Sequence, residues 1–219
     1  ASVEPVIQLV LARTPECCAC GCRTDADGGI HPQDTAALRA WFAGKNTILL
    51  AGPGLGESAG DVCNVLLGKR RPWAAAVLDA DALNALAAGK LRAALPEHTV
   101  LTPHPGEAAR LLRTTAGEVQ ADREAAALRL AEEYQCVAVL KGHETLVADP
   151  GGTVWRNTTG NAGLAAGWQQ GRTALDAALT AVWLHGAAAD RCAQRRSRTA
   201  MLPQDIFEDL GAVLAGLEA

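Results

Sequence analysis

The fold is decided by the stretch Val137-Ala138-Val139-Leu140-Lys141-Gly142, in which four apolar residues run directly into a lysine and a glycine. A short apolar run of this kind is typical of a strand buried in a parallel sheet, here with a cation at its carboxyl end. Two short β-type runs follow, Leu146–Ala148 and Val154–Arg156, joined by the turn residues Asp149-Pro150-Gly151-Gly152. This pattern predicts a hairpin directly after the buried strand.

A run of small residues, Asn157-Thr158-Thr159-Gly160-Asn161-Ala162-Gly163, comes after the hairpin. Gly160 and Gly163 would let backbone N–H groups approach a ligand closely. The Lys141 cation, the glycine loop and its hydroxyl groups together suit a nucleotide phosphate at the carboxyl edge of a sheet. A lysine at a strand end is also often simply solvated, so the residues alone leave both interpretations open.

Outward from this stretch, apolar β-type runs alternate with helical patterns. We expect further strands at Thr47–Ala51, Ala74–Leu78, Val100–Thr102 and, less regularly, Cys17–Cys22. We expect helices at Val3–Ala12, Asp34–Phe42 with Asp34 as its cap, Ser58–Leu67, Leu83–Ala88, Glu107–Leu112, Asp122–Tyr134, Leu175–Cys192 and Gln204–Leu217. The alternation predicts an α/β fold with βαβ units and a largely parallel sheet.

Glycines and polar side chains directly follow several of these strands. They are Gly52-Pro53-Gly54-Leu55-Gly56, Asp79, Asp81, Asn84, His104, Glu107 and Lys141. Because the carboxyl ends of parallel strands share one rim, where ligands bind, we expect these residues to line one cleft.

Simpler explanations exist for each of these residues. Gly-Pro-Gly-Leu-Gly also reads as a tight turn, and it is no dinucleotide fingerprint because the G-x-G-x-x-G spacing is absent. Asp79 and Asp81 are favoured as helix N-caps over a catalytic pair. His104 lies between two prolines, where ligand binding and an ordinary loop histidine are equally compatible.

Charge and hydropathy exclude some classes of partner. Twenty basic and twenty-four acidic residues give a formal net charge of -4, which indicates no nucleic-acid or anionic-membrane partner. No apolar run is long enough to span a bilayer and no signal peptide is visible, so we expect a cytoplasmic protein. The chain begins at Ala1 rather than at a methionine, as a fragment or a processed chain would.

The cysteines raise the question of a metal site. They are Cys17, Cys18, Cys20, Cys22, Cys63, Cys136 and Cys192. The crowded Cys17–Cys22 stretch lacks the second ligand pair that a zinc site requires. On a strand, Cys18, Cys20 and Cys22 would share one face, where thiols behave as small hydrophobes. We therefore expect reduced core thiols and no metal bound by the protein.

Six motifs follow one another in order. They are Gly52–Gly56, Leu78–Asn84, Leu101–Glu107, Leu140–Thr145, Gly160–Ala165 and Leu184–Asp190. From about Thr14 to its end, the chain resembles the ADP/ATP-dependent NAD(P)H-hydrate dehydratase family. The resemblance implies a single ribokinase-like domain over residues 1–219, a three-layer sandwich with a mostly parallel sheet and helices on both faces.

The resemblance also implies repair of damaged nicotinamide cofactor. The hydrated ring of NADHX or NADPHX would be phosphorylated on its new hydroxyl by ADP or ATP, with Mg²⁺, and loss of phosphate would restore NAD(P)H. Nucleotide binding would fall to Lys141, Gly142, His143, Glu144, Thr145, Gly160 and Asn161. Binding of the hydrated cofactor would fall to Gly54, Gly56, Asn84, His104 and Glu107. We expect a homo-oligomer.

Two departures from the family pattern stand out. The family opens with a strand and a glycine-rich loop ahead of anything in this chain. It also continues into a Gly-Gly-x-Gly-Asp segment whose Asp acts as the base, whereas here Gly167 runs straight into Trp168. No acidic residue lies between Asn157 and Asp176, so the sequence names no catalytic residue. We expect that a segment carrying this Asp is missing between Gly167 and Trp168.

Two alternatives therefore stay open. A small-molecule kinase of the same fold would also require the Gly-Asp loop, and the Thr102–Glu107 motif favours the dehydratase over it. The second alternative is a non-catalytic protein that binds an adenine nucleotide and has lost its anion hole.

Overall fold

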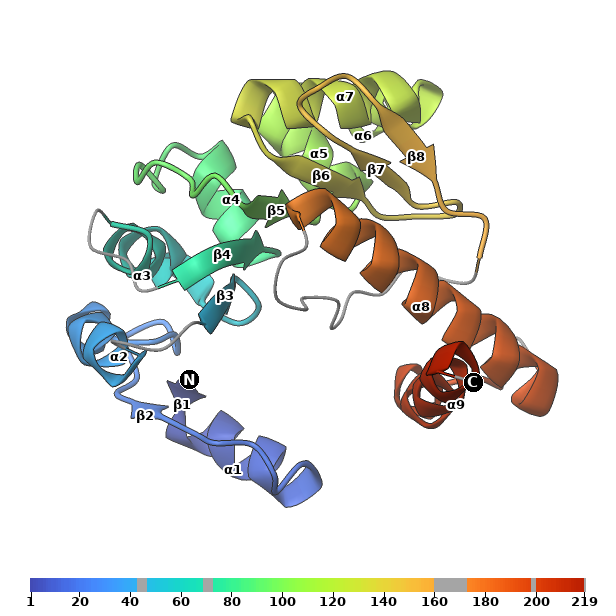
Figure 1. The fold of residues 1–219 in the computed structure, drawn as a ribbon. Coiled ribbons are helices and arrows are strands. Elements are labelled where there is room, and N and C mark those ends of the chain that lie inside the picture. Colours follow the sequence, from blue (N-terminus) through green and yellow to red (C-terminus); the bar gives the residue numbers. More distant parts are fainter. Residues whose placement is uncertain (43–46, 69–72, 160–172, 198–199, 219) are drawn as a thin grey trace. The chain divides into compact units, whose positions relative to one another are not determined.

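The computed structural model describes residues 1–42, 47–68, 73–159, 173–197 and 200–218 (Figure 1). These residues form two compact units, which are described separately. Unit 1 comprises Ala1–Leu101 and Arg110–Arg113, and unit 2 comprises Thr102–Ala109 and Thr114–Ala219. The helix α5 (Pro105–Leu112) contributes its first residues to unit 2 and its last to unit 1. The expectation of a single domain stays a prediction.

Three parallel strands form the sheet of unit 1: β3 (Thr47–Ala51), β4 (Trp73–Leu78) and β5 (Thr99–Leu101). The register pairs Leu50 with Val77, and Val77 with Val100. β4 is the middle strand, and its apolar run is buried at most positions, as expected for a parallel strand covered on both faces. All three strands lie where the sequence predicts them.

Helices α3 (Ala59–Leu66) and α4 (Asp81–Ala87) pack against each other in unit 1. Their apolar residues join the core through Val62, Cys63 and Leu83, which have almost no exposed surface. The N-terminal part of the unit holds α1 (Glu4–Arg13), α2 (Thr35–Phe42) and the short parallel strands β1 (Ser2–Val3) and β2 (Gly21–Cys22). Both predicted N-terminal helices are confirmed.

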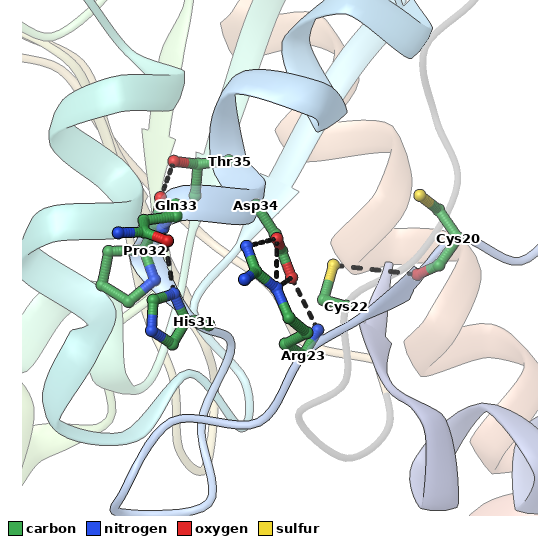
Figure 2. A network of polar contacts seen from close by, with 8 residues as sticks. All are labelled: Cys20, Cys22, Arg23, His31, Pro32, Gln33, Asp34 and Thr35. Atoms are coloured by element: carbon green, nitrogen blue, oxygen red, sulfur yellow. Dashed lines mark hydrogen bonds and ion pairs between the residues drawn. The ribbon is translucent and has the colours of Figure 1, made fainter.

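The prediction that Asp34 caps α2 is wrong. Pro32–Asp34 forms a 3₁₀ turn (η1) ahead of α2, and His31 caps that turn by accepting a hydrogen bond from Gln33 N at 3.3 Å. The Asp34 carboxylate instead accepts hydrogen bonds from the Arg23 guanidinium, at 3.0 Å and 2.5 Å, and from Arg23 N at 2.6 Å (Figure 2). A forked pair with arginine outcompetes a cap bond to a neutral amide, and it lowers the pKa of Asp34.

The predicted core face of the cysteine-rich stretch is also wrong in part. Only Gly21–Cys22 is a strand, so Cys17 and Cys18 are exposed, and Cys22 alone of the four is buried. Cys63, Cys136 and Cys192 are buried as expected, and all seven cysteines are free thiols. Burial raises the pKa of Cys63 and of Cys136 to about 12, which keeps these two thiols protonated and inert.

Unit 2 contains the antiparallel strands β6 (Val137–Leu140), β7 (Leu146–Ala148) and β8 (Val154–Arg156). The hairpin β7–β8 and its turn at Asp149 confirm the prediction, since Asp149 N donates to Thr153 O at 3.1 Å. Every residue of β6 is buried. Helix α7 (Arg123–Tyr134) packs on β6 and β7 and is capped by Asp122. A helix that the sequence analysis missed, α6 (Ala116–Ala121), precedes α7.

The long helix α8 (Ala174–Arg196) contacts β6 and β7 and also packs against α9 (Ile206–Glu218). Its first turn carries a capping box in which Thr173 and Asp176 satisfy each other's backbone N–H groups. In Figure 1, α9 lies beside the last turns of α8, where Ala188, Cys192 and Ile206 form a small core. No helix within the described ranges is long and apolar enough to cross a membrane.

Candidate functional site

The buried end of β6 meets the Thr102–Glu107 segment within unit 2. Lys141 follows β6 directly, and its backbone N donates to the carbonyl oxygen of Pro103 at 2.8 Å. Thr102 is fully buried. The main chain therefore holds the first residues of α5 against the tip of β6, although the two lie far apart in the sequence.

Glu107 is the centre of this arrangement. Its side chain is 7% exposed, and Oε2 accepts a hydrogen bond from His104 N at 2.8 Å. The ammonium of Lys141 lies 3.8 Å from the same oxygen, and Nε2 of His104 lies 3.4 Å from Oε1. A buried carboxylate is costly unless it is paired and hydrogen-bonded, and these partners meet that requirement.

His104 is held by its other nitrogen as well. Its Nδ1 accepts hydrogen bonds from Gly106 N at 3.0 Å and from Glu107 N at 3.3 Å, so the imidazole caps α5. A neutral ring that accepts at Nδ1 carries its hydrogen on Nε2, the nitrogen facing the Glu107 carboxylate. Half of the His104 side chain is exposed, so a fixed ring edge remains accessible to a ligand.

The segment after Lys141 has an unusual backbone. Gly142 has φ +143° and Glu144 has φ +51°, both in the region that side chains disfavour. Thr145 is buried and its hydroxyl donates to the carbonyl oxygen of Gly142 at 3.1 Å, which closes a short loop. The loop follows the end of a buried strand, which is a position where backbone N–H groups form anion sites.

Three arginine hydrogen bonds hold this loop from the side of α7. The guanidinium of Arg123 donates to the carbonyl oxygens of His143 at 3.0 Å, Leu140 at 3.2 Å and Lys141 at 3.4 Å. Burial, with the nearby charge of Arg156, lowers the pKa of Arg123. Arg156 itself pairs with Glu144 and Glu124, and its bond to Glu144 lowers the pKa of that carboxyl.

The chain after β8 is anchored on α8. Asn157 N donates to Thr145 O at 2.9 Å, and its side-chain amide donates to Thr159 O at 2.8 Å. Thr159 lies so close to Gly186 that a Cβ on Gly186 would overlap its hydroxyl and carbonyl oxygens. Gly160 and Asn161, predicted for nucleotide binding, lie outside the described residues, and so does the junction between Gly167 and Trp168.

In unit 1, the predicted substrate residues lie around the ends of β3 and β4. Gly54 and Gly56 have φ of +73° and +61°, and Gly56 N donates to the Asp81 carboxylate at 3.0 Å. The Asn84 side chain accepts a hydrogen bond from Arg110 at 2.9 Å. These contacts bring Gly54, Gly56 and Asn84 to one end of the unit 1 strands.

The prediction that Asp79 or Asp81 caps a helix is wrong. The cap position of α4 belongs to Ala80, which has φ +49° and makes no side-chain cap bond. Asp79 accepts from the backbone N of Ala80, and Asp81 reaches the glycine turn instead. The turn after β4 places the Asp81 carboxylate beside the backbone N–H of Gly56, which follows β3. Asp81 makes this contact instead of capping α4.

A model of the NAD(P)H-hydrate dehydratase family matches residues 29–211, a range that contains all six motifs of the sequence analysis. The chain belongs to the NAD(P)H-hydrate dehydratase family. The resemblance drawn from the motifs is thereby confirmed.

Curated relatives of this family member are longer proteins. The chain is 42% identical over 186 residues to a bifunctional NAD(P)H-hydrate repair enzyme of Moorella thermoacetica, a match that covers 78% of this chain and 35% of the relative. It is 45% identical over 130 residues to an ADP-dependent (S)-NAD(P)H-hydrate dehydratase of Neisseria meningitidis, covering 52% of this chain and 44% of that protein. The chain therefore spans less than half the length of these two relatives.

Solved structures confirm the ribokinase-like α/β fold. An ADP/ATP-dependent NAD(P)H-hydrate dehydratase of Bacillus subtilis, co-crystallized with ATP/Mg²⁺ and soaked with CoA, aligns with a TM-score of 0.72 at 28% identity, over 97% of this chain and 78% of that one. A ribokinase-like superfamily protein of Enterococcus faecalis aligns with a TM-score of 0.73 at 22% identity, over 98% and 75%. The second likeness concerns the fold alone.

Sequence reasoning missed two side chains that hold the site of this NAD(P)H-hydrate dehydratase family member, Arg123 and Arg110. It named Asp81 but did not foresee the contact of Asp81 with Gly56. Gly142, directly after Lys141, was the sequence signal that something packs closely against this loop. A Cβ on Gly142 would lie 2.5 Å from Nη1 of Arg123. Within the described part of the chain, no group of three His, Cys, Asp or Glu residues could hold a metal ion.

Proposed function

We propose that the chain catalyses the ADP- or ATP-dependent dehydration of hydrated NADH or NADPH back to NAD(P)H, a metabolite-repair lyase reaction. The observation that carries the proposal is the junction in unit 2 between Lys141 and the Thr102–Glu107 segment. The resemblance assigns the first to the nucleotide and the second to the hydrated cofactor, and phosphoryl transfer requires that donor and acceptor meet.

On the nucleotide side, the Lys141–Thr145 loop supplies one ammonium group and the backbone of a buried strand end. Phosphoryl transfer depends on positioned cations and backbone donors more than on covalent help from the protein, and this loop has both. Gly160 and Asn161 would complete the nucleotide site. Mg²⁺ would bind with the nucleotide, since this ion usually keeps several waters and is held through phosphates.

On the cofactor side, His104 and Glu107 would contact the hydrated nicotinamide nucleotide, together with Gly54, Gly56 and Asn84. The fixed imidazole edge of His104 offers a hydrogen-bonding group at a known position. The Glu107 carboxylate already accepts a hydrogen bond from His104 N and lies beside the Lys141 ammonium, so its main part would be to hold these two residues in place.

The reaction would run in two steps. Attack of the ring hydroxyl oxygen on the terminal phosphorus of ADP or ATP, with release of the hydroxyl proton, would break the phosphoanhydride bond, leaving AMP or ADP and a phosphorylated ring. The C–O bond between the ring and the phosphate would then break, its electron pair leaving with phosphate, while the neighbouring ring carbon loses a proton and the double bond of the dihydronicotinamide forms. Lys141 would stabilise the negative charge on the transferred phosphoryl group.

The test is turnover of purified chain with hydrated NADH, ADP or ATP and Mg²⁺, followed by the recovery of dihydronicotinamide absorbance. We expect recovery that depends on both the nucleotide and the protein. Absorbance that recovers equally without nucleotide would contradict the proposal.

A second candidate is favoured by one observation: no acidic residue lies between Asn157 and Asp176. Asp176 is engaged in the capping box of α8. A chain that lacks a base for the substrate hydroxyl would bind the adenine nucleotide without useful turnover. Calorimetric binding of ADP, combined with no recovery of NADH, would select this candidate over the lyase.

We also propose a cytoplasmic location and self-association. The exposed free thiols of Cys17 and Cys18 suit a reducing compartment. Phe207 and Leu217 on α9 are 69% and 62% exposed, an apolar surface that a second copy could cover. Light scattering coupled to gel filtration measures the oligomeric state.

A further inference from the structure

We propose that Arg123 is the positioning residue that sets the nucleotide-binding conformation of the Lys141–Thr145 loop. This inference rests on the proposed function, which assigns that loop to the adenine nucleotide. Arg123 lies at the first position of α7, directly after the capping residue Asp122. It reaches the loop from outside the six motifs of the family resemblance.

The contacts are made to the backbone rather than to side chains. Nη1 of Arg123 donates to His143 O at 3.0 Å, while Nη2 donates to Leu140 O at 3.2 Å and Lys141 O at 3.4 Å. The carbonyls of Leu140, Lys141 and His143 thus converge on one planar guanidinium. Only arginine carries several N–H donors in a fixed fork, so no other side chain could bridge these three oxygens at once.

Gly142 is the loop residue that leaves room for the Arg123 guanidinium. Its φ of +143° turns the chain so that the carbonyls on both sides of it face Arg123. A Cβ at this position would lie 2.5 Å from Nη1 and 3.0 Å from Nη2. The guanidinium therefore occupies the space that a side chain at position 142 would need.

Two backbone hydrogen bonds hold the first and last residues of the loop. Lys141 N is held by Pro103 O, and the Thr145 carbonyl is held by Asn157 N. Without Arg123, these ties and the bond from the Thr145 hydroxyl to Gly142 O would remain, but the carbonyls of Leu140, Lys141 and His143 would lose their common donor. Lys141 would then sample positions away from Glu107.

The charged groups around Arg123 fit a positioning role. Arg156 and Glu144 are its charged neighbours, and Arg156 is already occupied by Glu144 and Glu124. Among the residues that the structure describes, the hydrogen bonds of Arg123 all go to loop carbonyls rather than to a carboxylate. Its positive charge is thus directed at the loop.

The test compares Arg123→Ala and Arg123→Lys with Arg129→Ala, a matched control on an exposed position of the same helix. We expect Arg123→Ala to raise the Kd for ADP at least about tenfold, because hydrogen bonds from a charged donor are lost. Arg123→Lys keeps the charge without the fork and should restore only part of the affinity. Arg129→Ala should leave the affinity unchanged.

Hydrogen–deuterium exchange separates positioning from general stability. In Arg123→Ala, the amides of Gly142–Thr145 should exchange faster while those in the middle of α7 keep the rates of the unsubstituted chain. Equal ADP affinity in Arg123→Ala and the unsubstituted chain, or faster exchange throughout α7, would overturn the inference.

A double-variant cycle gives an independent measure. Gly142→Ala should weaken ADP binding strongly beside Arg123 and less in the Arg123→Ala background, where the clash with the guanidinium is absent. Additive effects would contradict the pairing. If the unsubstituted chain bound no adenine nucleotide, the proposed function and the nucleotide part of this inference would both fail, while the exchange rates would still decide the anchoring.

Discussion

At the scale of single residues, the site depends on one buried carboxylate. The Glu107 carboxylate contacts both His104 and Lys141, which come from segments far apart in the sequence. Removing His104 or Lys141 leaves the buried Glu107 carboxylate with less compensation, which costs more than the contact itself contributes. Each residue of this group is therefore sensitive to substitution for structural as well as functional reasons.

Lys141→Ala tests the nucleotide role directly. A charge-assisted contact to phosphate is worth roughly 1.5–3 kcal/mol, so the variant should bind ADP about tenfold or more weakly in calorimetry. Lys90→Ala is the matched control, because Lys90 pairs only at the surface with Glu57. Circular dichroism checks that both variants fold, and unchanged ADP affinity in folded Lys141→Ala would rule the role out.

At the scale of elements, α8 ties the site to the rest of unit 2. The segment Asn157–Thr159 leaves β8 and is bonded to the backbone of α8 at Val182 and Trp183. The close approach at Gly186 makes this possible, since a larger residue would push Thr159 away. A glycine inside a long helix thus has a packing reason that helix propensity alone would not suggest.

Two glycine substitutions should act with opposite signs. Gly186→Ala should lower the melting temperature, because the added Cβ meets the Thr159 backbone and has no room to move. Gly211→Ala in α9 meets nothing within 4 Å, so it should gain about 0.5–1 kcal/mol from better helix propensity. Thermal denaturation measures both, and a stabilised Gly186→Ala variant would contradict the packing account.

The contact between α8 and α9 should be acid-sensitive. The hydrogen bond from Arg195 lowers the pKa of Asp209, so the ionised carboxylate stabilises the folded state. This contribution is complete above the pKa of the unfolded chain, about 3.9, and is lost as the pH falls through the lower folded value. Asp209→Asn should therefore lose less stability than the unsubstituted chain as the pH falls below about 4.

Denaturant unfolding at several pH values checks this expectation. Glu208→Gln is the control, because Glu208 pairs with the same arginine but is 73% exposed at its side chain. Identical acid profiles for Asp209→Asn and the unsubstituted chain would exclude Asp209 as a source of the acid sensitivity.

At the scale of the whole molecule, the two sets of predicted cofactor residues belong to different units. Gly54, Gly56 and Asn84 are in unit 1, and His104 and Glu107 are in unit 2. The expectation that the Gly54–Gly56 loop faces one cleft with His104 and Lys141 stays a prediction. A ligand that contacts both sets would test it.

Gly54→Ala offers such a test. Gly54 has φ +73°, where a side chain costs about 1 kcal/mol or more, and a shift of the loop that relieves this strain would displace it from the ligand; the variant should therefore bind hydrated NADH about fivefold more weakly and ADP equally well. Gly28→Ala is the control, since Gly28 has φ +87° and equal space around it but belongs to no predicted site. Unchanged affinity for hydrated NADH in Gly54→Ala, measured by competition binding, would remove the loop from the cofactor site.

Local sequence patterns were enough to predict most strands and helices of this protein and to identify its family. The apolar run Val137–Leu140 favours a buried strand because it is too short for a helix and carries two β-branched valines. The turn Asp149–Gly152 likewise has local chemistry that specifies a hairpin. The ordered motifs identified the family for the same reason: each is a short stretch that can be recognised without its neighbours.

The partner of each polar side chain, in contrast, depends on how distant segments pack together. Asp34, Asp79 and Asp81 all stand where local rules predict a helix cap, yet each bonds elsewhere. The role of Arg123 was likewise hidden from local rules, because it depends on three carbonyls that lie 17, 18 and 20 residues away in the sequence. Competing partners for a carboxylate or a guanidinium differ by only about 1 kcal/mol, so the packing that brings one partner within reach makes the choice.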